Sequence, residues 1–190
     1  MAFLKNTTSL ADAYIIEPQV FWDSRGFFME TYSMIEFEKI GINTNFVQDN
    51  HSKSKKWVLR GLHFQTRKPQ AKLVRVTSGS VYDVIVDLRK DSPTFGKWEG
   101  FLLSAENKKM LFVPRGFAHG FLTLEDDTEF LYKCDDVYDS GYEGGIIWND
   151  EILQIHWKEL LEKYAIESPQ VSQKDEQNWT MKEYLIQPIF

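Results

Sequence analysis

Cysteine is almost absent from this sequence. The 190 residues contain one, Cys134, so no disulfide can form within the chain. Structural disulfides belong to oxidising compartments, and a chain without them suits a reducing one. We therefore expect a cytoplasmic location.

Long apolar runs are missing as well. No window approaches the roughly 20 consecutive apolar residues of a membrane-spanning helix, and the opening MAFLKNTTSLADAY lacks the apolar stretch of a signal peptide. There is no repeat of fixed period and no low-complexity tract. These features predict a single domain over residues 1–190, with no membrane partner.

An excess of positive charge is the third absence. The net charge is −6 at pH 7, which argues against a nucleic-acid partner, because nucleic-acid-binding surfaces are basic. An anionic ligand would instead need a local cluster of cations.

Apolar residues are plentiful, and they fall into short strand-like stretches between residues 13 and 148. The stretch AKLVRVTSGSVYDVIVDL predicts two strands that form a hairpin at Ser78-Gly79-Ser80, and GIIWND ends the series. Helical spacing is confined to SMIEFEKIG and IHWKELLEKYAI. The latter begins a helical and extended segment, about 150–190, that we expect to pack on the body or on a second subunit. Closely spaced strands without crossover helices favour an antiparallel sandwich or barrel.

The stretch RGLHFQTRKPQAKLVRV places a single histidine on a predicted strand. Period-two alternation puts His63 on the face of Gly61 and Gln65, and Arg60 on the opposite face. Three interpretations compete for His63. It can be a catalytic base, a buried histidine with a hydrogen-bond partner, or half of a metal site.

The metal interpretation has the least support. A metal-binding cupin barrel carries a His-x-His pair, a carboxylate and a later histidine. Here Gln65 stands at the second ligand position, and only His119 follows, in PRGFAHGF. Zinc and iron sites as a rule need three protein ligands. We therefore expect no metal, in a cupin barrel that has lost its first-strand ligands.

A set of motifs occurs in one order across residues 13–176: DSRGFFMETY, RGLHFQ, KLVRV, GSVYDVIVDLRKDSPTFGKW, LFVPRGFAHGF, EFLYKC, WND and SQKD. In this order they resemble the dTDP-4-dehydrorhamnose 3,5-epimerases. The resemblance implies a mainly β fold, a cupin-type antiparallel β-barrel or jelly roll with short flanking helices. It also implies an isomerase without metal or cofactor. That family inverts carbons 3 and 5 of dTDP-4-keto-6-deoxyglucose on the route to dTDP-L-rhamnose.

The resemblance implies four catalytic roles. His63 is the base, because an imidazole titrates near neutral pH. Lys72 is the fixed cation that stabilises the enolate. Tyr132 is the proton donor on the opposite face of the sugar, and Asp175 in SQKD orients the His63 ring.

It also implies a set of side chains that bind the sugar nucleotide: Arg25, Phe28, Glu30, Gln48, Asn50, Arg60, His119, Tyr138, Glu143 and Lys174. Arg60 and His119 contact the sugar and the diphosphate, and Tyr138 stacks on thymine. In the family the N-terminal strands, here about 13–32, reach the site of the neighbouring subunit. We therefore expect a homodimer with shared sites.

Several alternatives stay open. A related enzyme could invert only carbon 3 or only carbon 5, or act as a keto-isomerase, and a non-catalytic sugar-nucleotide-binding cupin would need no catalytic set. Arg25 could have only a structural role in the turn before a strand. Tyr138 and Trp148 could be aromatic residues of the core or of an interface. Asp83 lies on a mixed strand face, where it is expected to tune Lys72 or His119.

Overall fold

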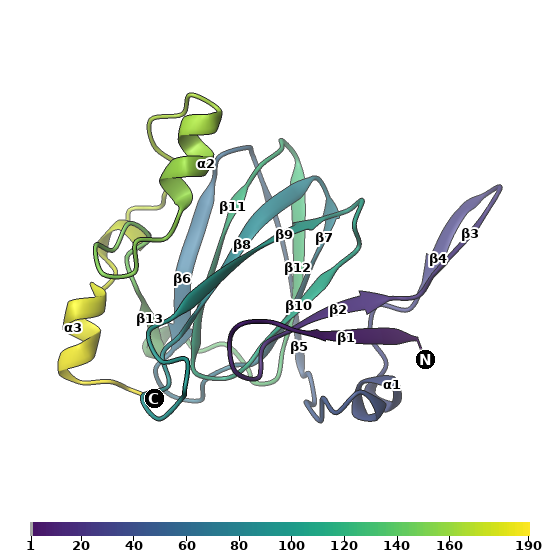
Figure 1. The fold of residues 1–190 in the computed structure, drawn as a ribbon, viewed down its shortest axis with the longest axis horizontal. Coiled ribbons are helices and arrows are strands. Elements are labelled where there is room, and N and C mark those ends of the chain that lie inside the picture. Colours follow the sequence, from purple (N-terminus) through teal and green to yellow (C-terminus); the bar gives the residue numbers. More distant parts are fainter. Residues whose placement is uncertain (1) are drawn as a thin grey trace.

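Two antiparallel β-sheets face each other and form the body of the molecule (Figure 1). The computed structural model describes residues 2–190, with Lys158 described by its backbone alone. The larger sheet has six strands in the spatial order β1 (Phe3–Thr7), β2 (Tyr14–Pro18), β10 (Met110–Val113), β7 (Lys72–Ser78), β12 (Thr128–Cys134) and β5 (Gln48–Ser54). The smaller has five in the order β13 (Glu143–Gly145), β6 (Leu59–Gln65), β11 (Phe117–Thr123), β8 (Ser80–Asp87) and β9 (Trp98–Ser104).

An apolar core fills the space between the sheets. Val74 on β7 and Phe130 on β12 belong to the six-stranded sheet, and Val81 and Ile85 on β8 and Phe121 on β11 belong to the five-stranded sheet. All five are buried. Alternation along each strand turns these side chains inward and their sequence neighbours outward. The antiparallel barrel or sandwich predicted from the strand pattern is thus confirmed.

The hairpin predicted at Ser78–Ser80 is wrong. The strands β7 and β8 exist with the expected bounds, but they lie in different sheets, so the chain crosses from one sheet to the other at Gly79. Gly79 has a φ of 72°, and a Cβ there would lie 2.4 Å from Thr128 Oγ1. Val76 and Val81, on either side of the crossing, are buried in the same core. The two strands therefore meet through their side chains and not through a hydrogen-bonded edge.

The C-terminal segment covers the outer face of the five-stranded sheet (Figure 1). It contains α2 (Trp157–Lys163), the 3₁₀ turn η2 (Asp175–Gln177) and α3 (Met181–Ile186). Trp157 and Tyr184 pack in one cluster with Val84 and Leu122 of the sheet. The predicted helix in IHWKELLEKYAI is confirmed. The strand expected in GIIWND is displaced, because β13 ends at Gly145 and Ile146 forms only an isolated bridge with Trp179.

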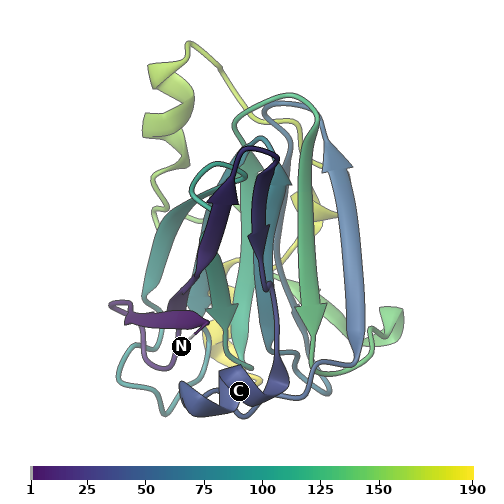
Figure 2. The same cartoon turned by 90° about the vertical axis from the view of Figure 1, so that its right-hand side faces the viewer.

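The N-terminal part adds a projecting hairpin of β3 (Val20–Asp23) and β4 (Gly26–Met29), which points away from the barrel (Figure 1). After it, α1 (Met34–Lys39) is the helix predicted in SMIEFEKIG, and the Ser33 side chain accepts a hydrogen bond from its first turn. Figure 2 shows that the N-terminal strands lie on the side of the six-stranded sheet. Strand β1 was not predicted, because only Phe3 of its five residues is buried. No described helix is long and apolar enough to cross a membrane.

Candidate active site

A break in the alternation of β6 places Arg60 and His63 on the same cavity. On β11, Phe121 and His119 are two residues apart, but their partners on β6, Arg60 and His63, are three apart. The extra residue on β6 is a bulge, which shifts the side-chain alternation by one position. Gly61 lies inside it with a φ of 110°, and a Cβ there would lie 2.6 Å from Gly120 Cα. The opposite faces expected for Arg60 and His63 are therefore wrong.

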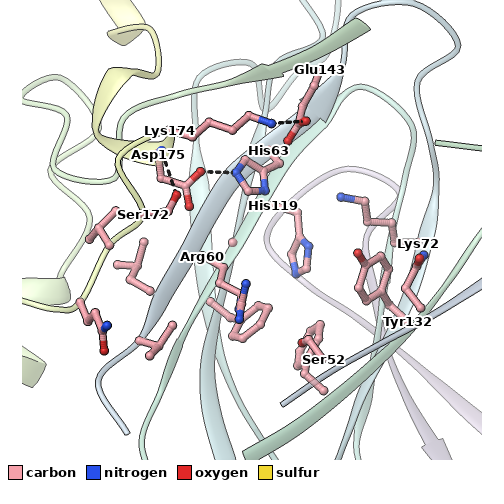
Figure 3. A pocket seen from close by; sticks show the side chains of 18 of the residues that line it. Ser52, Arg60, His63, Lys72, His119, Tyr132, Glu143, Ser172, Lys174 and Asp175 are labelled. Carbon is pink, nitrogen blue, oxygen red and sulfur yellow. Dashed lines mark hydrogen bonds and ion pairs between the residues drawn. The ribbon is translucent and has the colours of Figure 1, made fainter. Parts of the chain in front are cut away.

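An open cavity of about 590 Å³ lies between the sheets. It brings together most of the predicted site residues: Asn50, Arg60, His63, Lys72, His119, Tyr132, Glu143, Lys174 and Asp175. A smaller cavity of about 120 Å³ adjoins it and adds Gln48 and Tyr138. Figure 3 shows His63 and Asp175 on one side of the larger cavity, with Lys72 and Tyr132 on the other. The two walls come from different sheets, His63 from β6 and Lys72 and Tyr132 from β7 and β12.

Asp175 holds the His63 ring. The Nε2–H of His63 donates to Asp175 Oδ1 at 2.5 Å, and the Gly61 N–H donates to the other carboxylate oxygen at 3.3 Å. The backbone N–H of Asp175 in turn donates to Ser172 Oγ at 3.2 Å. Burial alone would raise the pKa of Asp175, but the hydrogen bonds, chiefly that of His63, outweigh it and lower the pKa. The carboxylate stays ionised, and His63 Nδ1 is left for a ligand.

Lys72 and Tyr132 form the facing wall. The Lys72 Nζ lies 5.9 Å from the centre of the Tyr132 ring. Burial lowers the pKa of Lys72 and raises the pKa of Tyr132. The phenol therefore keeps its proton at neutral pH. Stacked Phe121 and Phe130 rings, one from each sheet, lie 4.0 Å apart and line the same cavity.

Glu143 joins two side chains at the edge of the cavity. The Tyr138 hydroxyl donates to Glu143 Oε2 at 2.5 Å, and the Lys174 ammonium pairs with the same carboxylate (Figure 3). The hydrogen bond to Glu143 raises the pKa of Tyr138 to about 12. The pair links the segment that carries Asp175 to the strand β13 beside His63, since Gly145 is the β-partner of His63. The Lys174–Glu143 contact thus supports the same junction as the His63–Asp175 hydrogen bond.

Sequence comparison identifies the family. The model for dTDP-4-dehydrorhamnose 3,5-epimerase matches residues 7–183 of the chain. The chain belongs to this family. The family, the cupin-type fold and the isomerase class predicted from the motifs are thereby confirmed.

Relatives cover most of the chain. The dTDP-4-dehydrorhamnose 3,5-epimerase of Salmonella typhimurium is 58% identical over 152 residues, which is 79% of this chain and 83% of that protein. The solved structure of the Bacillus anthracis enzyme with TDP and PPi bound has a TM-score of 0.88 and 46% identity, covering 94% of this chain and 99% of that one. The Legionella pneumophila dTDP-6-deoxy-D-glucose-3,5-epimerase, solved with dTDP-4-keto-L-rhamnose, has a TM-score of 0.87 and 43% identity over 95% and 93% of the two chains.

Three of the binding residues that family membership implies lie outside the cavity of their own chain. Phe28 lies on the projecting hairpin, Glu30 directly follows β4, and Arg25 occupies the turn, where it pairs with Asp23 at 2.5 Å. The hairpin carries them away from the barrel (Figure 1). A single chain therefore brings together every predicted catalytic residue but not every predicted binding residue.

Other lining residues were not predicted. Ser52, Gln170 and Ser172 contribute polar groups to the cavity wall. Ser172 could have been noticed as a hydroxyl three residues before Asp175, the spacing of a local side-chain turn. Gln170 gives no such signal, because its position depends on backbone hydrogen bonds with Trp57 and Leu59, which lie more than a hundred residues away in sequence.

Proposed function

We propose that the chain inverts carbons 3 and 5 of dTDP-4-keto-6-deoxyglucose to give dTDP-4-keto-L-rhamnose, in the formation of dTDP-L-rhamnose. The observation that carries the proposal is the placement of a histidine–carboxylate pair and a tyrosine on facing walls of one cavity, with a lysine beside the tyrosine. Inversion next to a ketone needs proton removal from one face and proton return to the other. Two groups on opposite walls provide that separation.

His63 takes the proton from the carbon next to the 4-keto group. Its Nε2–H is held by Asp175, so Nδ1 is the basic nitrogen. Protonation turns the ring into an imidazolium, which the ionised Asp175 stabilises at 2.5 Å. General base catalysis of this kind contributes ~10²–10⁴ in rate.

Lys72 stabilises the negative charge that moves onto the ketone oxygen. Loss of a fixed group of this kind costs ~10²–10³ in rate. Tyr132 then returns a proton from the other wall, which it can do because its raised pKa keeps the hydroxyl protonated. The steps repeat at the second carbon, since the ketone acidifies both neighbours, and no cofactor or metal is needed.

The nucleotide is bound at the mouth of the cavity. Arg60 and Lys174 supply cations for the diphosphate, which suits a chain whose net charge of −6 offers no general attraction for anions. Tyr138 is half exposed, so its ring is open to stacking on thymine. Gln48 and Asn50 line the adjoining cavity and bind on the nucleotide side.

A second copy of the chain completes the site and makes the enzyme a homodimer. The projecting hairpin exposes four large aromatics, Phe21, Trp22, Phe27 and Phe28, each more than half accessible to solvent. Exposed apolar surface of this kind marks an interaction site. Burial against a partner would bring Arg25, Phe28 and Glu30 to the partner's cavity. The cytoplasmic location stays a prediction of the sequence.

Proton exchange in heavy water tests the reaction. We expect dTDP-4-keto-6-deoxyglucose to take up deuterium at carbons 3 and 5 and to yield inverted product, followed separately at each carbon by NMR. In His63→Ala, exchange at both carbons should fall by ~10² or more. In Tyr132→Phe, deuterium should still enter the unchanged sugar while inverted product fails to accumulate.

The same assay separates the alternatives. Exchange at one carbon alone would identify a single-carbon epimerase, and a product with a moved carbonyl would identify a keto-isomerase. If the wild type shows no deuterium exchange at either carbon, the protein is a non-catalytic sugar-nucleotide-binding module. Equal loss of exchange and inversion in Tyr132→Phe would refute the assignment of the two walls.

Subunit mixing tests the shared site. If Arg25 serves the partner's cavity, His63→Ala and Arg25→Ala chains are each inactive, but a mixed dimer holds one intact site. Random reassembly makes half of the dimers mixed, so activity should return to about a quarter of the wild-type value. Mixing His63→Ala with Tyr132→Phe is the control and should restore nothing, because both side chains belong to one chain's cavity. A monomeric mass at active concentrations would refute the dimer.

A further inference from the structure

The segment that carries Tyr138 is exposed along its whole length. Residues 137–142, which we call the Tyr138 loop, lie in the connection from β12 of the six-stranded sheet to β13 of the five-stranded sheet. Val137 and Tyr138 are each at least half accessible to solvent, so apolar burial contributes little to holding the loop. Its position therefore depends mainly on hydrogen bonds.

Two glutamine side chains hold the middle of the loop. The Tyr138 N–H donates to Gln48 Oε1 at 2.9 Å, and the Asp139 N–H donates to Gln65 Oε1 at 3.2 Å. Gln48 is the first residue of β5 in the six-stranded sheet, and Gln65 is the last residue of β6 in the five-stranded sheet. Each sheet thus supplies one acceptor, and the two acceptors bind consecutive N–H groups of the loop.

The two ends of the loop are held by other contacts. The Thr66 N–H donates to the carbonyl oxygen of Tyr142 at 2.7 Å. Just before the loop, the carbonyl oxygen of Asp136 accepts from the Gln70 side chain at 2.7 Å. Loss of the Gln65 contact would therefore release the middle of the loop, where Tyr138 lies, and leave both ends attached.

Gln65 is the buried member of the glutamine pair. Only 4% of it is exposed, and it lines the smaller cavity together with Tyr138. It also stands two residues after His63, where a metal-binding cupin has its second histidine ligand. A side chain that is fixed by packing presents its acceptor oxygen in one place before the loop binds to it. Gln65 is thus suited to fix the position of a loop that cannot fix itself.

We propose that Gln65 is a positioning residue for nucleotide binding: its carboxamide oxygen holds the Asp139 N–H and thereby keeps the Tyr138 ring in place for stacking on the base. The proposal rests on the proposed function for the role of Tyr138. At a position where a metal-binding cupin has a ligand, this chain has an anchor for a binding loop. The hydrogen bond itself can be measured without substrate.

Hydrogen exchange of the loop amides tests the contact in the free protein. In the wild type, the Asp139 N–H should exchange more slowly than an unprotected amide in an NMR solvent-exchange experiment. Gln65→Met replaces the carboxamide by an unbranched side chain of similar length without the oxygen. The variant should fold, because methionine suits a buried position. Its Asp139 N–H should exchange about 2- to 12-fold faster, the effect of one hydrogen bond.

Two further variants separate the acceptor oxygen from other effects. Gln65→Glu keeps an oxygen at the same reach and should retain the wild-type protection of the Asp139 N–H. Equal loss of protection in Gln65→Met and Gln65→Glu would assign the effect to disturbed packing and not to the acceptor. The control Gln187→Met makes the first change at an exposed residue that directly follows α3 and lines neither cavity. It should leave the exchange rate unchanged.

Binding of dTDP is the second measurement. A loop that is in place for only a fraction of the time lowers the apparent affinity by that fraction. The Kd of Gln65→Met for dTDP, measured by calorimetry, should rise about 2- to 12-fold. KM should rise with it, and kcat should change less, because the catalytic side chains are unaltered. Gln65→Glu is compared by amide exchange alone, since an added negative charge would itself oppose a diphosphate.

Three results would overturn the proposal. The first is an Asp139 N–H that exchanges in the wild type as an unprotected amide does. The second is wild-type exchange of this N–H in Gln65→Met. The third is faster exchange in Gln65→Met without any loss of affinity for dTDP. A wild type that does not bind dTDP would overturn the proposed function instead, and amide exchange would still decide whether Gln65 holds the loop.

Discussion

Replacement of Asp175 by asparagine tests the arrangement on which proton removal depends. The change keeps the size of a side chain that is only 5% exposed, and it removes the charge of the group that accepts from His63 at 2.5 Å. The amide can still accept from the Gly61 N–H, and the backbone bond from Asp175 to Ser172 is untouched. The fold should therefore survive.

The magnitude follows from the lost hydrogen bond. A hydrogen bond to a charged group contributes ~1.5–3 kcal/mol, and ~1.4 kcal/mol corresponds to tenfold in rate. Because the bond strengthens as the His63 ring takes up the proton, the loss falls on the transition state. Deuterium exchange at carbons 3 and 5 should fall about 10- to 100-fold, with a smaller effect than His63→Ala.

The control is Glu176→Gln, which removes the same charge from the next residue, exposed to solvent. It should exchange at the wild-type rate. Wild-type exchange in Asp175→Asn, together with its loss in His63→Ala, would show that the carboxylate does not assist the base. An equal loss of deuterium exchange in Asp175→Asn and Glu176→Gln would indicate that the substitutions disturb the segment around residues 175 and 176, and not that the hydrogen bond to His63 is needed.

The same variant has a pH signature in stability. The folded pKa of Asp175 is lowered below its ordinary value of 3.8. The ionised form is therefore favoured by folding, and its stabilisation is fully present above that ordinary value and is lost as the pH falls through the folded value. Urea unfolding at a series of pH values should give the wild type a larger free energy of unfolding than Asp175→Asn at neutral pH. This difference in the free energy of unfolding should disappear at acid pH. A difference that is independent of pH would contradict the expected pH dependence.

Three further outcomes are expected. Gly61→Ala should lower the free energy of unfolding by ~2 kcal/mol or more, measured by urea denaturation, because its φ is positive and its Cβ would meet backbone atoms at 2.6 Å; an unchanged midpoint would contradict this. In a spectrophotometric titration corrected with Tyr138→Phe, the Tyr138 phenol should ionise with a pKa of about 12, and Glu143→Gln should move it down toward 10.0. Dialysis against a chelator should leave activity intact, since Gln65 stands where a metal-binding cupin has a histidine; activity lost with one stoichiometric metal would refute the metal-free mechanism.

The placement of His63, Lys72 and Tyr132 at one cavity could be predicted because these residues carry local signals. Each is an ionisable side chain on a strand rich in apolar residues, and their motifs occur in a fixed order. Period-two alternation was enough to turn Lys72 and Tyr132 inward. Asp175 needed the motif, because nothing in its own neighbourhood indicates that it lies against a strand more than a hundred residues earlier.

Partner-dependent features could not be predicted. The bulge on β6 is defined by its register against β11, and the crossing at Gly79 depends on which sheet each strand joins. Alternation within one strand contains neither piece of information. The same limit applies to Asp83, whose placement on a mixed face was visible but whose bond to His119 comes from pairing between β8 and β11.

The stacked Phe121 and Phe130 rings set the width of the reaction space. Phe121 belongs to the sheet that carries His63 and Phe130 to the sheet that carries Tyr132, and the two ring centres lie 4.0 Å apart. The two rings hold the facing sheets apart. The distance between the sheets that is available to a sugar ring is therefore determined by apolar packing and not by the ionisable side chains. A smaller side chain at position 121 or 130 would let the two sheets approach each other. The fit of the sugar would then change although no ionisable side chain had been replaced.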